Sequence, residues 1–500
     1  MASPDESFSN LLCEMVGCHA AAGRTALLGR FGAVSYAELF AKIVDVSALF
    51  QGLSRGETVG ILTSRSPDAV ALFFGVMKAG GCPCFLEPRL DPEVLRDRLV
   101  AVGLRRLVLE GEAEALAGDL GGAGIIVHCL SGVRSVETDG ADGGESLASD
   151  DLAMMQFTSG STGRPKGVLL THENLRSNAE GIIERTSLSS SDRLLHIMPF
   201  HHTNGVNNQL VAPLVAGASI VLVETFNAAD IESQIADYEA TYMTGVPTMY
   251  SRILPHLENK EKRRSLRFLR CGSAPISSSL HRRIETAFGV PLIVSYGVSE
   301  ATCTSTMNPV AARRIGSVGT VLRGQCVRVF RPGSTEQVAT GCEGEIAIAG
   351  PSVMRGYAEG ADEQPVKGGW LRTGDLGSFD CDGYLAITGR LKDVIVRGGE
   401  NLSPRAIEAV LDRHPGVGSS CVVGVPHMDL GEVPVAFVQL RSGERATEVD
   451  LKVFAGRQLS RIHVPLEVRF ITSWPETSVG KIDRRALRDS LAIPYVADTD

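Results

Sequence analysis

Short apolar runs alternate with longer amphipathic stretches from about residue 56 onward. The β-branched run TVGILTS at 58–64 predicts a buried strand. Ser66-Pro67 then opens an apolar helix that continues to Lys78, and Ala79-Gly80-Gly81 separates this helix from a second predicted strand in CPCFLEP. The order strand, helix, strand is typical of a βαβ unit.

The same alternation continues through the next two hundred residues. Further strands are expected at 105–111, 124–130, 152–158, 193–199 and 219–224, and helices at 172–186, 207–215, 231–239 and 278–288. TYMTGVP, LRFLRCG and PLIVSYG add three more short strands. The pattern predicts an α/β fold with a large N-terminal body of doubly wound sheets.

Two changes of pattern divide the rest of the chain. Closely spaced short strands with Gly, Pro and Asp turns predict a β subdomain at about 316–390. After Arg390 a smaller α+β unit begins, in which Ser403-Pro404 starts a helix that runs to about His414, and 449–460 form a second helix. We therefore expect an N-terminal domain over 1–390 and a small, mobile C-terminal domain over 391–500.

Composition narrows the class of protein. The net charge is 49 − 58 = −9, and 44% hydrophobic with 21% charged residues is close to an average globular chain, so nothing indicates a nucleic-acid partner. No apolar run reaches the roughly 18 residues that a membrane span needs, and MASPDESFSN is acidic where a signal peptide is basic. We expect a cytoplasmic protein with free thiols, and the sequence carries no indication of oligomeric state.

A glycine-rich loop follows the strand expected at 152–158. The segment TSGSTGRPKG at 158–167 has three glycines, four hydroxyls and Lys166, which together suit a phosphate group held by backbone amides and a cation. It lacks the GK[ST] of a Walker A loop and the G-x-G-x-x-G of a dinucleotide site. The residues expected to bind phosphate are Thr158, Ser159, Gly160, Ser161, Thr162, Gly163 and Lys166.

This loop resembles the signature of the acyl-adenylate-forming superfamily, which includes acyl-CoA synthetases, aryl-acid and amino-acid adenylating enzymes, and firefly luciferase. Five further segments match the family's motifs in the family's order: YGVSE (296–300), WLRTGD (370–375), GRLKD (389–393), GGEN (398–401) and PETSVGKIDR (475–484). The resemblance covers nearly the whole chain and is closest to the acyl-CoA synthetases. It implies that a carboxylic acid is activated by ATP as an acyl-AMP, with release of pyrophosphate.

The resemblance also assigns roles to individual residues. Glu300 resembles the ligand of Mg²⁺, and Lys481, presented by the C-terminal domain, resembles the cation that bridges the substrate carboxylate and the α-phosphate. Tyr296 resembles the ring that stacks on adenine, and Ser299 stands where the family usually has a threonine at the α-phosphate. The remaining expected contacts to ATP or AMP are Gly272, Ser273, Ala274, Pro275, Gly297, Asp375 and Arg390.

The segment MPFHHTNG at 198–205 resembles the family's P-x-x-H segment, which makes His202 a catalytic candidate near the substrate carboxylate and the thiol entrance. A zinc site is disfavoured, because His196, His201 and His202 lack ligand spacing on one face.

No Asp occurs between 198 and 210 to pair with an α-ammonium group of the substrate, so we expect an acid without an α-amine. The acyl-pocket candidates are His201, Asn204, Val246 and Cys303. Core packing explains Val246 and Cys303 equally well, and a capping or solvent-facing position explains Asn204 equally well.

Two reactions are expected from one site. The resemblance places a hinge at Lys392, about which the small domain turns from adenylation to thioester formation, and it places Gly398 and Gly399 along the pantetheine of coenzyme A. ATP, Mg²⁺ and coenzyme A are the implied cofactors. An acyl carrier protein is the alternative acceptor, although the inserted segment of long-chain acyl-AMP ligases is not evident. A non-catalytic ligand-binding member is a second alternative, disfavoured because Lys166, Glu300, Asp375, Arg390 and Lys481 occur together.

Overall fold

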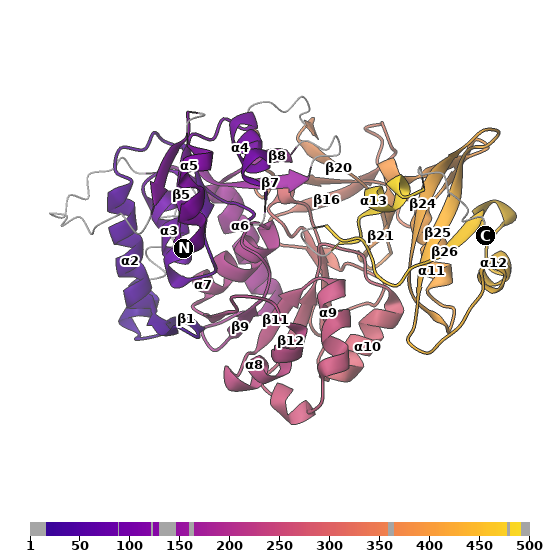
Figure 1. Ribbon diagram of the computed structural model, residues 1–500, viewed down its shortest axis with the longest axis horizontal. Helices are drawn as coiled ribbons and strands as arrows, with labels where there is room; N and C mark the ends of the chain where they lie inside the picture. The colour runs from indigo at the N-terminus through magenta and orange to yellow at the C-terminus, as the bar shows by residue number, and fades with distance from the viewer. Residues whose placement is uncertain are drawn as a thin grey trace, which may run out of the picture.

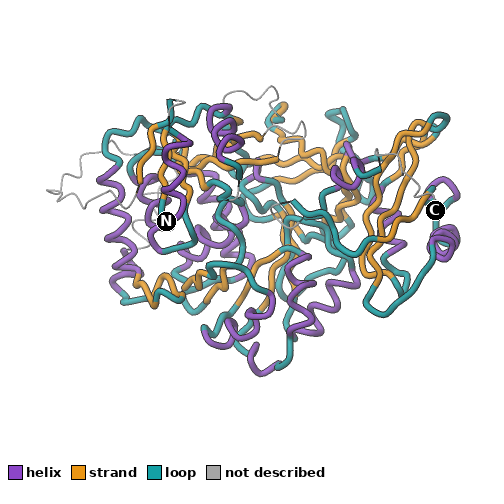
Figure 2. Tube along the Cα trace, viewed as in Figure 1, coloured by secondary structure: helices purple, strands orange, loops and turns teal. Residues whose placement is uncertain are grey.

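The computed structural model describes residues 17–88, 90–121, 124–129, 147–159, 165–358, 365–477 and 481–491. Figure 1 shows a large body of sheets and helices, with the C-terminal residues gathered into a smaller, strand-rich lobe at one end. Strands run through the middle of the body and helices cover them, as Figure 2 shows. The predicted α/β fold class is confirmed.

The predicted βαβ unit is present in a four-stranded parallel sheet near the N-terminus. Its strand order is β4 (Cys82–Phe85), β3 (Thr58–Leu62), β5 (Arg106–Leu109) and β6 (Ile126–Cys129). The Ser66 hydroxyl accepts a hydrogen bond from the Ala69 amide at 3.0 Å and thereby caps α3 (Pro67–Lys78). Helices α2 (Tyr36–Leu49), α4 (Pro92–Ala101) and α5 (Ala117–Leu120) complete this part of the body.

A nine-stranded sheet forms the centre of the body. Its order is β15 (Thr320–Val321), β14 (Thr306–Met307), β13 (Leu292–Tyr296), β12 (Phe268–Cys271), β11 (Tyr242–Gly245), β9 (Arg193–His196), β10 (Ser219–Leu222), β1 (Thr25–Gly29) and β2 (Gly32–Ser35). The strands from β13 to β1 pair in parallel. Their carboxyl ends therefore meet at one edge, where α/β sheets bind ligands.

Helices α6 (His172–Thr186), α8 (Ile231–Asp237), α9 (Pro247–Ile253) and α10 (Ser278–Phe288) accompany this sheet. The single helix expected over 207–215 is wrong. A π-helix, Asn204–Val211, leads into the short α7 (Ala212–Ala216) instead. The chain is so tight here that a Cβ on Gly205 would lie 2.0 Å from the Pro199 carbonyl oxygen. Such π-helical turns occur frequently at functional sites.

The strand expected at 152–158 does not continue the N-terminal series. It is β7 (Leu152–Ser159), which forms an antiparallel hairpin with β8 (Pro165–Thr171), and β18 (Gly356–Tyr357) pairs with the other edge of β8. The expected phosphate loop thus joins two paired strands. Its residues Gly160, Ser161, Thr162 and Gly163 lie outside the described residues, as does the side chain of Ser159.

The region of short strands forms a five-stranded sheet of β16 (Cys326–Phe330), β17 (Gly344–Ala349), β20 (Trp370–Phe379), β19 (Val366–Lys367) and β21 (Leu385–Arg390). The small lobe holds a second such sheet: β23 (Glu400–Leu402), β22 (Ile395–Arg397), β25 (Gly431–Leu440), β24 (Val417–His427) and β26 (Glu467–Phe470). Helices α11 (Pro404–Leu411), α12 (Glu448–Gly456) and α13 (Arg484–Asp489) pack beside it.

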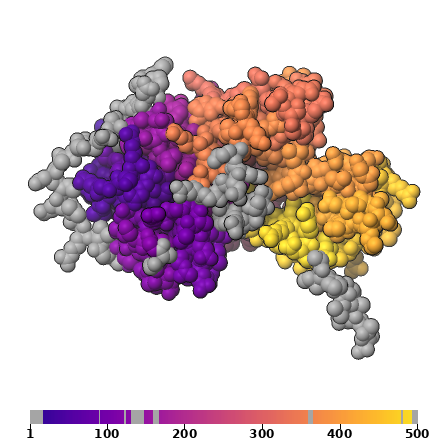
Figure 3. Space-filling model, turned by 90° about the horizontal axis from the view of Figure 1, so that it is seen from above, coloured from indigo at the N-terminus to yellow at the C-terminus, as the bar shows by residue number. Residues whose placement is uncertain are grey.

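Both helices predicted for the small lobe are shorter than expected, since α11 ends at Leu411 and α12 at Gly456. Ser403 precedes α11, but its hydroxyl donates to the Thr388 carbonyl at 2.8 Å and makes no capping bond. This contact ties the start of the helix to β21. Seen from above, the small lobe projects from the end of the body (Figure 3).

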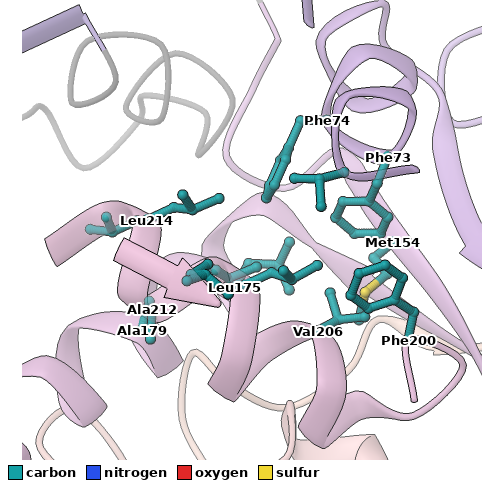
Figure 4. Close-up of a cluster of buried hydrophobic side chains, with 14 of the residues drawn as sticks. Phe73, Phe74, Met154, Leu175, Ala179, Phe200, Val206, Ala212 and Leu214 are labelled. Carbon is teal, nitrogen blue, oxygen red and sulfur yellow. The ribbon is translucent and has the colours of Figure 1, made fainter. Parts of the chain in front are cut away.

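The largest hydrophobic core lies beneath the carboxyl edge of the sheets. Figure 4 shows Phe73 and Phe74 of α3 facing Met154, Phe200 and Val206, so α3, β7 and the π-helical segment share one buried cluster. The Phe85 and Phe200 rings stack with centroids 4.8 Å apart. This packing holds the 198–211 segment rigidly. Among the helices of the described ranges, none has the length and apolar character that crossing a bilayer requires.

Candidate active site

Lys166 stands at the base of the glycine-rich loop. It faces Thr158 across the β7–β8 hairpin, and its Nζ lies 4.9 Å from the centre of the Tyr357 ring on β18. Gly167 next to it admits no side chain, because a Cβ there would lie 2.7 Å from the Met155 sulfur. The hairpin therefore presents a cation at a fixed position beside the loop expected to bind phosphate.

Glu300 lies close to the same place. It belongs to the short 3₁₀ turn Ser299–Ala301 after β13, and the Tyr357 hydroxyl donates to its Oε1 at 2.8 Å. Tyr357 thus contacts both the Lys166 ammonium and the Glu300 carboxylate. The two residues that the sequence assigned to phosphate and to Mg²⁺ are brought together by this tyrosine, which the sequence analysis did not single out.

A hydrogen-bonded chain joins Tyr296, Asp375 and Arg390. The Tyr296 hydroxyl donates to Asp375 Oδ2 at 2.8 Å, and Arg390 Nε donates to Asp375 Oδ1 at 2.6 Å. Burial and the nearby Asp375 carboxylate raise the pKa of Tyr296 well above its usual value. Burial opposes the charge of Arg390, but Asp375 outweighs it and raises the pKa of that guanidinium. Three nucleotide-binding candidates from distant motifs therefore meet at the end of β13.

We expect Asp375→Asn to lower the free energy of unfolding by about 1–2 kcal/mol. Asp375 is only 4% exposed, and an amide cannot accept from both Tyr296 and Arg390 with the same strength. The Arg390 side chain is 48% exposed, which limits the loss because water can replace the carboxylate. Urea unfolding followed by circular dichroism measures the change. Tyr296→Phe, which removes one donor only, should cost less, and an unchanged midpoint for Asp375→Asn would contradict this account.

Lys481 comes from the small lobe and enters the site of the large one. Its side chain is half-buried near Arg390 and Asp375, whose charges act on it, as does the Cys303 thiol. Burial and then Arg390 lower the pKa of Lys481, while Cys303 and Asp375 oppose that shift. Thr477 holds the end of the lysine loop, because its amide donates to the Lys481 carbonyl at 2.8 Å.

An ion pair between the lobes accompanies this arrangement. Arg252 Nη2 on α9 lies 2.6 Å and 2.7 Å from the two carboxylate oxygens of Glu476, five residues before Lys481. The structure therefore has the small lobe turned so that its lysine faces the nucleotide candidates. Lys392 lies in the exposed turn Leu391–Asp393 directly after β21, where the chain passes into that lobe.

Gly398 and Gly399 are not brought to this site. They form the exposed turn between β22 and β23 and have φ angles of +60° and +87°, which favour glycine. The Gly398 amide donates to the Leu430 carbonyl at 2.8 Å. These two residues thus lie on a different part of the small lobe from the lysine loop.

His201 and His202 follow β9, and their rings lie with centroids 4.4 Å apart and planes tilted by 54°. Burial and the Arg65 charge lower the pKa of His201 to about 4. Burial, His201 and then Lys481 hold the pKa of His202 well below its usual value, so both rings are neutral near pH 7. The Nε2 atoms of both rings are buried without a hydrogen bond in the described part of the chain. They are available to a ligand.

Ser299 and Ser273 connect the candidate nucleotide loops to the π-helical segment. Ser299 Oγ lies 2.8 Å from Thr203 Oγ1, and Asn204 Nδ2 donates to Ser273 Oγ at 3.4 Å. Ser273 has a φ of +64° in the loop Gly272-Ser273-Ala274-Pro275, between β12 and α10. Left-handed backbone at a non-glycine residue is strained and is common at functional sites.

Cys303, like Ser273, has a left-handed backbone conformation, with a φ of +83°. Gly297 packs against it so closely that a Cβ would lie 2.2 Å from the Cys303 carbonyl oxygen. Asn208 Nδ2 lies 3.2 Å from the Cys303 sulfur and donates to Asn204 Oδ1 at 2.9 Å. Val246 is fully buried at the start of α9. Asn208 therefore connects two of the acyl-pocket candidates, Asn204 and Cys303, in a region that begins three residues after the third candidate, His201.

Arg270 is a site residue that the sequence analysis missed. It lies on β12 with 1% of its surface exposed, and its side chain shares this region with Cys303. The available signal was a charged residue inside the apolar strand FLRC. Its neighbours come from other strands, so sequence spacing alone could not place it.

Comparison with known proteins identifies the family. Residues 17–358 match the family model described as AMP-binding enzyme, and residues 406–481 match the AMP-binding enzyme C-terminal domain. The sulfoacetate–CoA ligase of Cupriavidus necator is 35% identical over 87% of this chain and 88% of its own. A feruloyl-CoA synthase of Amycolatopsis is 33% identical over 91% of this chain and 94% of its own length.

A solved structure agrees over nearly the full length. The crystal structure of ATP-bound MatB from Rhodopseudomonas palustris has a TM-score of 0.90 and 30% identity, covering 97% of this chain and 99% of its own. The chain belongs to the AMP-binding enzyme family. The predicted resemblance is confirmed, and with it the class: an ATP-dependent acid–CoA ligase of the AMP-forming type.

Proposed function

We propose that this protein activates a carboxylic acid without an α-amine as an acyl-AMP, in the arrangement of lobes described above, and then transfers the acyl group to coenzyme A. The observation that carries the proposal is Lys481, which belongs to the small lobe but lies half-buried beside Asp375 and Arg390 of the large one. A flexible, strongly hydrated ammonium is costly to bury unless an anion meets it. The acid and the α-phosphate are those anions.

The first reaction joins two anions. An oxygen of the substrate carboxylate attacks the α-phosphorus of ATP, and the bond to the β-phosphate oxygen breaks, so that pyrophosphate leaves. Lys481 would neutralise charge at the point of attack, and Lys166 would do so at the departing phosphates. Asp375 and Arg390 would hold the nucleotide, and the neutral ring of His202 would hydrogen-bond to the acid.

Glu300 would hold Mg²⁺. One carboxylate oxygen accepts from Tyr357, and the second makes no hydrogen bond to the described residues. One carboxylate with phosphate oxygens and water is a usual ligand set for Mg²⁺. When bound, the ion neutralises phosphate charge and orients the leaving group. The residues present fit this role.

The second reaction uses another face of the small lobe. The thiol sulfur of coenzyme A attacks the acyl carbon, AMP leaves, and the thiol proton is released. For this step we propose a rotation at Lys392, which withdraws the lysine loop and brings Gly398 and Gly399 toward the site. The exposed turn that these glycines form can approach an extended pantetheine closely.

Acid-dependent pyrophosphate release tests the proposal. Incubation with ATP, Mg²⁺ and a panel of acids should release pyrophosphate with at least one of them, and added coenzyme A should yield the thioester. An α-amino acid should be used at least about tenfold less efficiently than the matching acid without the amine. No pyrophosphate release with any acid, or a preference for α-amino acids, would overturn the proposal.

A further inference from the structure

Arg270 is the most deeply buried arginine near the site. It lies opposite Thr244 of β11 and Ile293 of β13, in the middle of the nine-stranded sheet. Leu269 and Cys271, its neighbours along β12, point into the cluster on the other face of the sheet. Arg270 therefore points to the face on which the π-helical segment and Cys303 lie.

Within the described residues, this guanidinium has no hydrogen-bond or ion-pair partner. Its Nε, Nη1 and Nη2 atoms are all buried without a hydrogen bond, and no carboxylate pairs with it anywhere in the described ranges. Burial lowers the pKa of Arg270, but a guanidinium keeps its proton at neutral pH. A protein seldom keeps a buried charge without a counter-charge, because the desolvation is not compensated. The arrangement calls for an anion from outside the chain.

Other buried polar atoms around Arg270 lack partners as well. The Thr244 hydroxyl, directly opposite on β11, and the Tyr242 hydroxyl two residues earlier make no hydrogen bond in the described part of the chain. A guanidinium and two hydroxyl donors can together satisfy a carboxylate or a sulfonate.

Cys303 links this group to the reaction centre. Burial raises the pKa of the Cys303 thiol, and the positive charges of Arg270 and Lys481 both oppose the rise. The Cys303 sulfur is therefore within electrostatic reach of two cations from different lobes. The same sulfur lies 3.2 Å from Asn208 Nδ2 on the π-helix, so Cys303 belongs to the region that both cations reach.

We propose that the acid substrate is short and carries a second anionic group, a carboxylate or a sulfonate, which Arg270 binds. This inference rests on the proposed function, because it assigns the far end of the same substrate. The donors around Arg270 are shielded from solvent, so an anion that pairs with them would be enclosed by protein, as the end of a compact acid is. Arg270 would then select the substrate, since a monoacid leaves its charge unpaired.

Matched acids test the inference. We would measure the kcat/KM of pyrophosphate release for succinate against butyrate, malonate against propionate, and sulfoacetate against acetate. At least one doubly charged acid should exceed its matched monoacid by at least about 100-fold. The first two pairs report a carboxylate at the far end and the third a sulfonate. For the preferred pair, Arg270→Met should lower the ratio about 100-fold.

Arg267→Met is the matched control, because Arg267 lies on the same segment but pairs with Asp192. It should leave the ratio unchanged. Apo Arg270→Met should unfold at an equal or higher urea concentration than the wild type, since it removes an unpaired buried charge. A lower midpoint would mean that Arg270 is structural and would overturn the inference.

The two proposals fail in different ways. If monoacids release pyrophosphate as efficiently as their doubly charged partners, or if Arg270→Met leaves the ratio unchanged, the inference about Arg270 is wrong while the ligase activity stands. If no acid in any pair releases pyrophosphate although another acid of the wider panel does, the inference about Arg270 is again wrong and the ligase activity stands. If no acid of the pairs or of the panel releases pyrophosphate, the proposed function itself fails.

Discussion

Replacing Lys481 with alanine is expected to slow acyl-AMP formation by about 1000-fold or more, because the attacking carboxylate and the α-phosphate would then meet without a cation between them. The effect should fall on adenylation alone. If the small lobe turns away for the second reaction, thioester formation from preformed acyl-AMP and coenzyme A should change by less than about threefold. Pyrophosphate exchange measures the first half-reaction, and release of AMP from acyl-AMP measures the second.

The prediction for Lys481→Ala separates two models. Lys367→Ala, an exposed lysine on β19, is the control for loss of one positive charge and should leave both half-reactions unchanged. Equal losses in both half-reactions, in a mutant that unfolds at the wild-type urea concentration, would contradict the use of two faces. Lys481 is half-buried beside the like charge of Arg390, so its removal should not lower the unfolding midpoint.

Local signals in the sequence predicted many elements well. The helices expected at 172–186 and 278–288 have the observed limits, because Thr171 and Ser277 cap them and hydrophobic residues repeat along one face. The β7 strand was expected in the right place but assigned to the wrong sheet. The apolar run of β7 is compatible with either sheet. Its actual pairing is with β8, which follows the glycine-rich loop.

The candidate site also combines residues that the sequence could assign with residues that it could not. The motifs assigned Tyr296, Asp375 and Arg390 to the nucleotide, and hydrogen bonds join these three residues in the structure; the nucleotide contacts themselves stay a prediction. Tyr357 and Arg270 could not be predicted, since each matters through partners from distant strands. The π-helix was missed for a related reason. The side-chain amides of Asn204 and Asn207 donate to Ser273 and Thr302, and the spacing of residues along the chain does not indicate such contacts.

Glu300→Gln is expected to reduce the rate of pyrophosphate exchange by about 100-fold or more and to raise the Mg²⁺ concentration needed for half-maximal rate. A glutamine keeps the size of the side chain and can still accept from the Tyr357 hydroxyl, so the fold should be preserved. What it loses is the negative charge that attracts a divalent cation. The exposed Glu343→Gln serves as the charge-matched control.

Tyr357→Phe separates the metal role from the positioning role. It removes the hydroxyl that holds Glu300 but keeps the carboxylate and the ring beside Lys166. We expect an intermediate loss, about tenfold, with little change in the Mg²⁺ requirement, because a carboxylate without its hydrogen bond still binds the ion but spends less time aimed at the phosphates. A Glu300→Gln enzyme whose Mg²⁺ dependence matched the wild type would show that this carboxylate acts on the fold or on Lys166 and not on the metal.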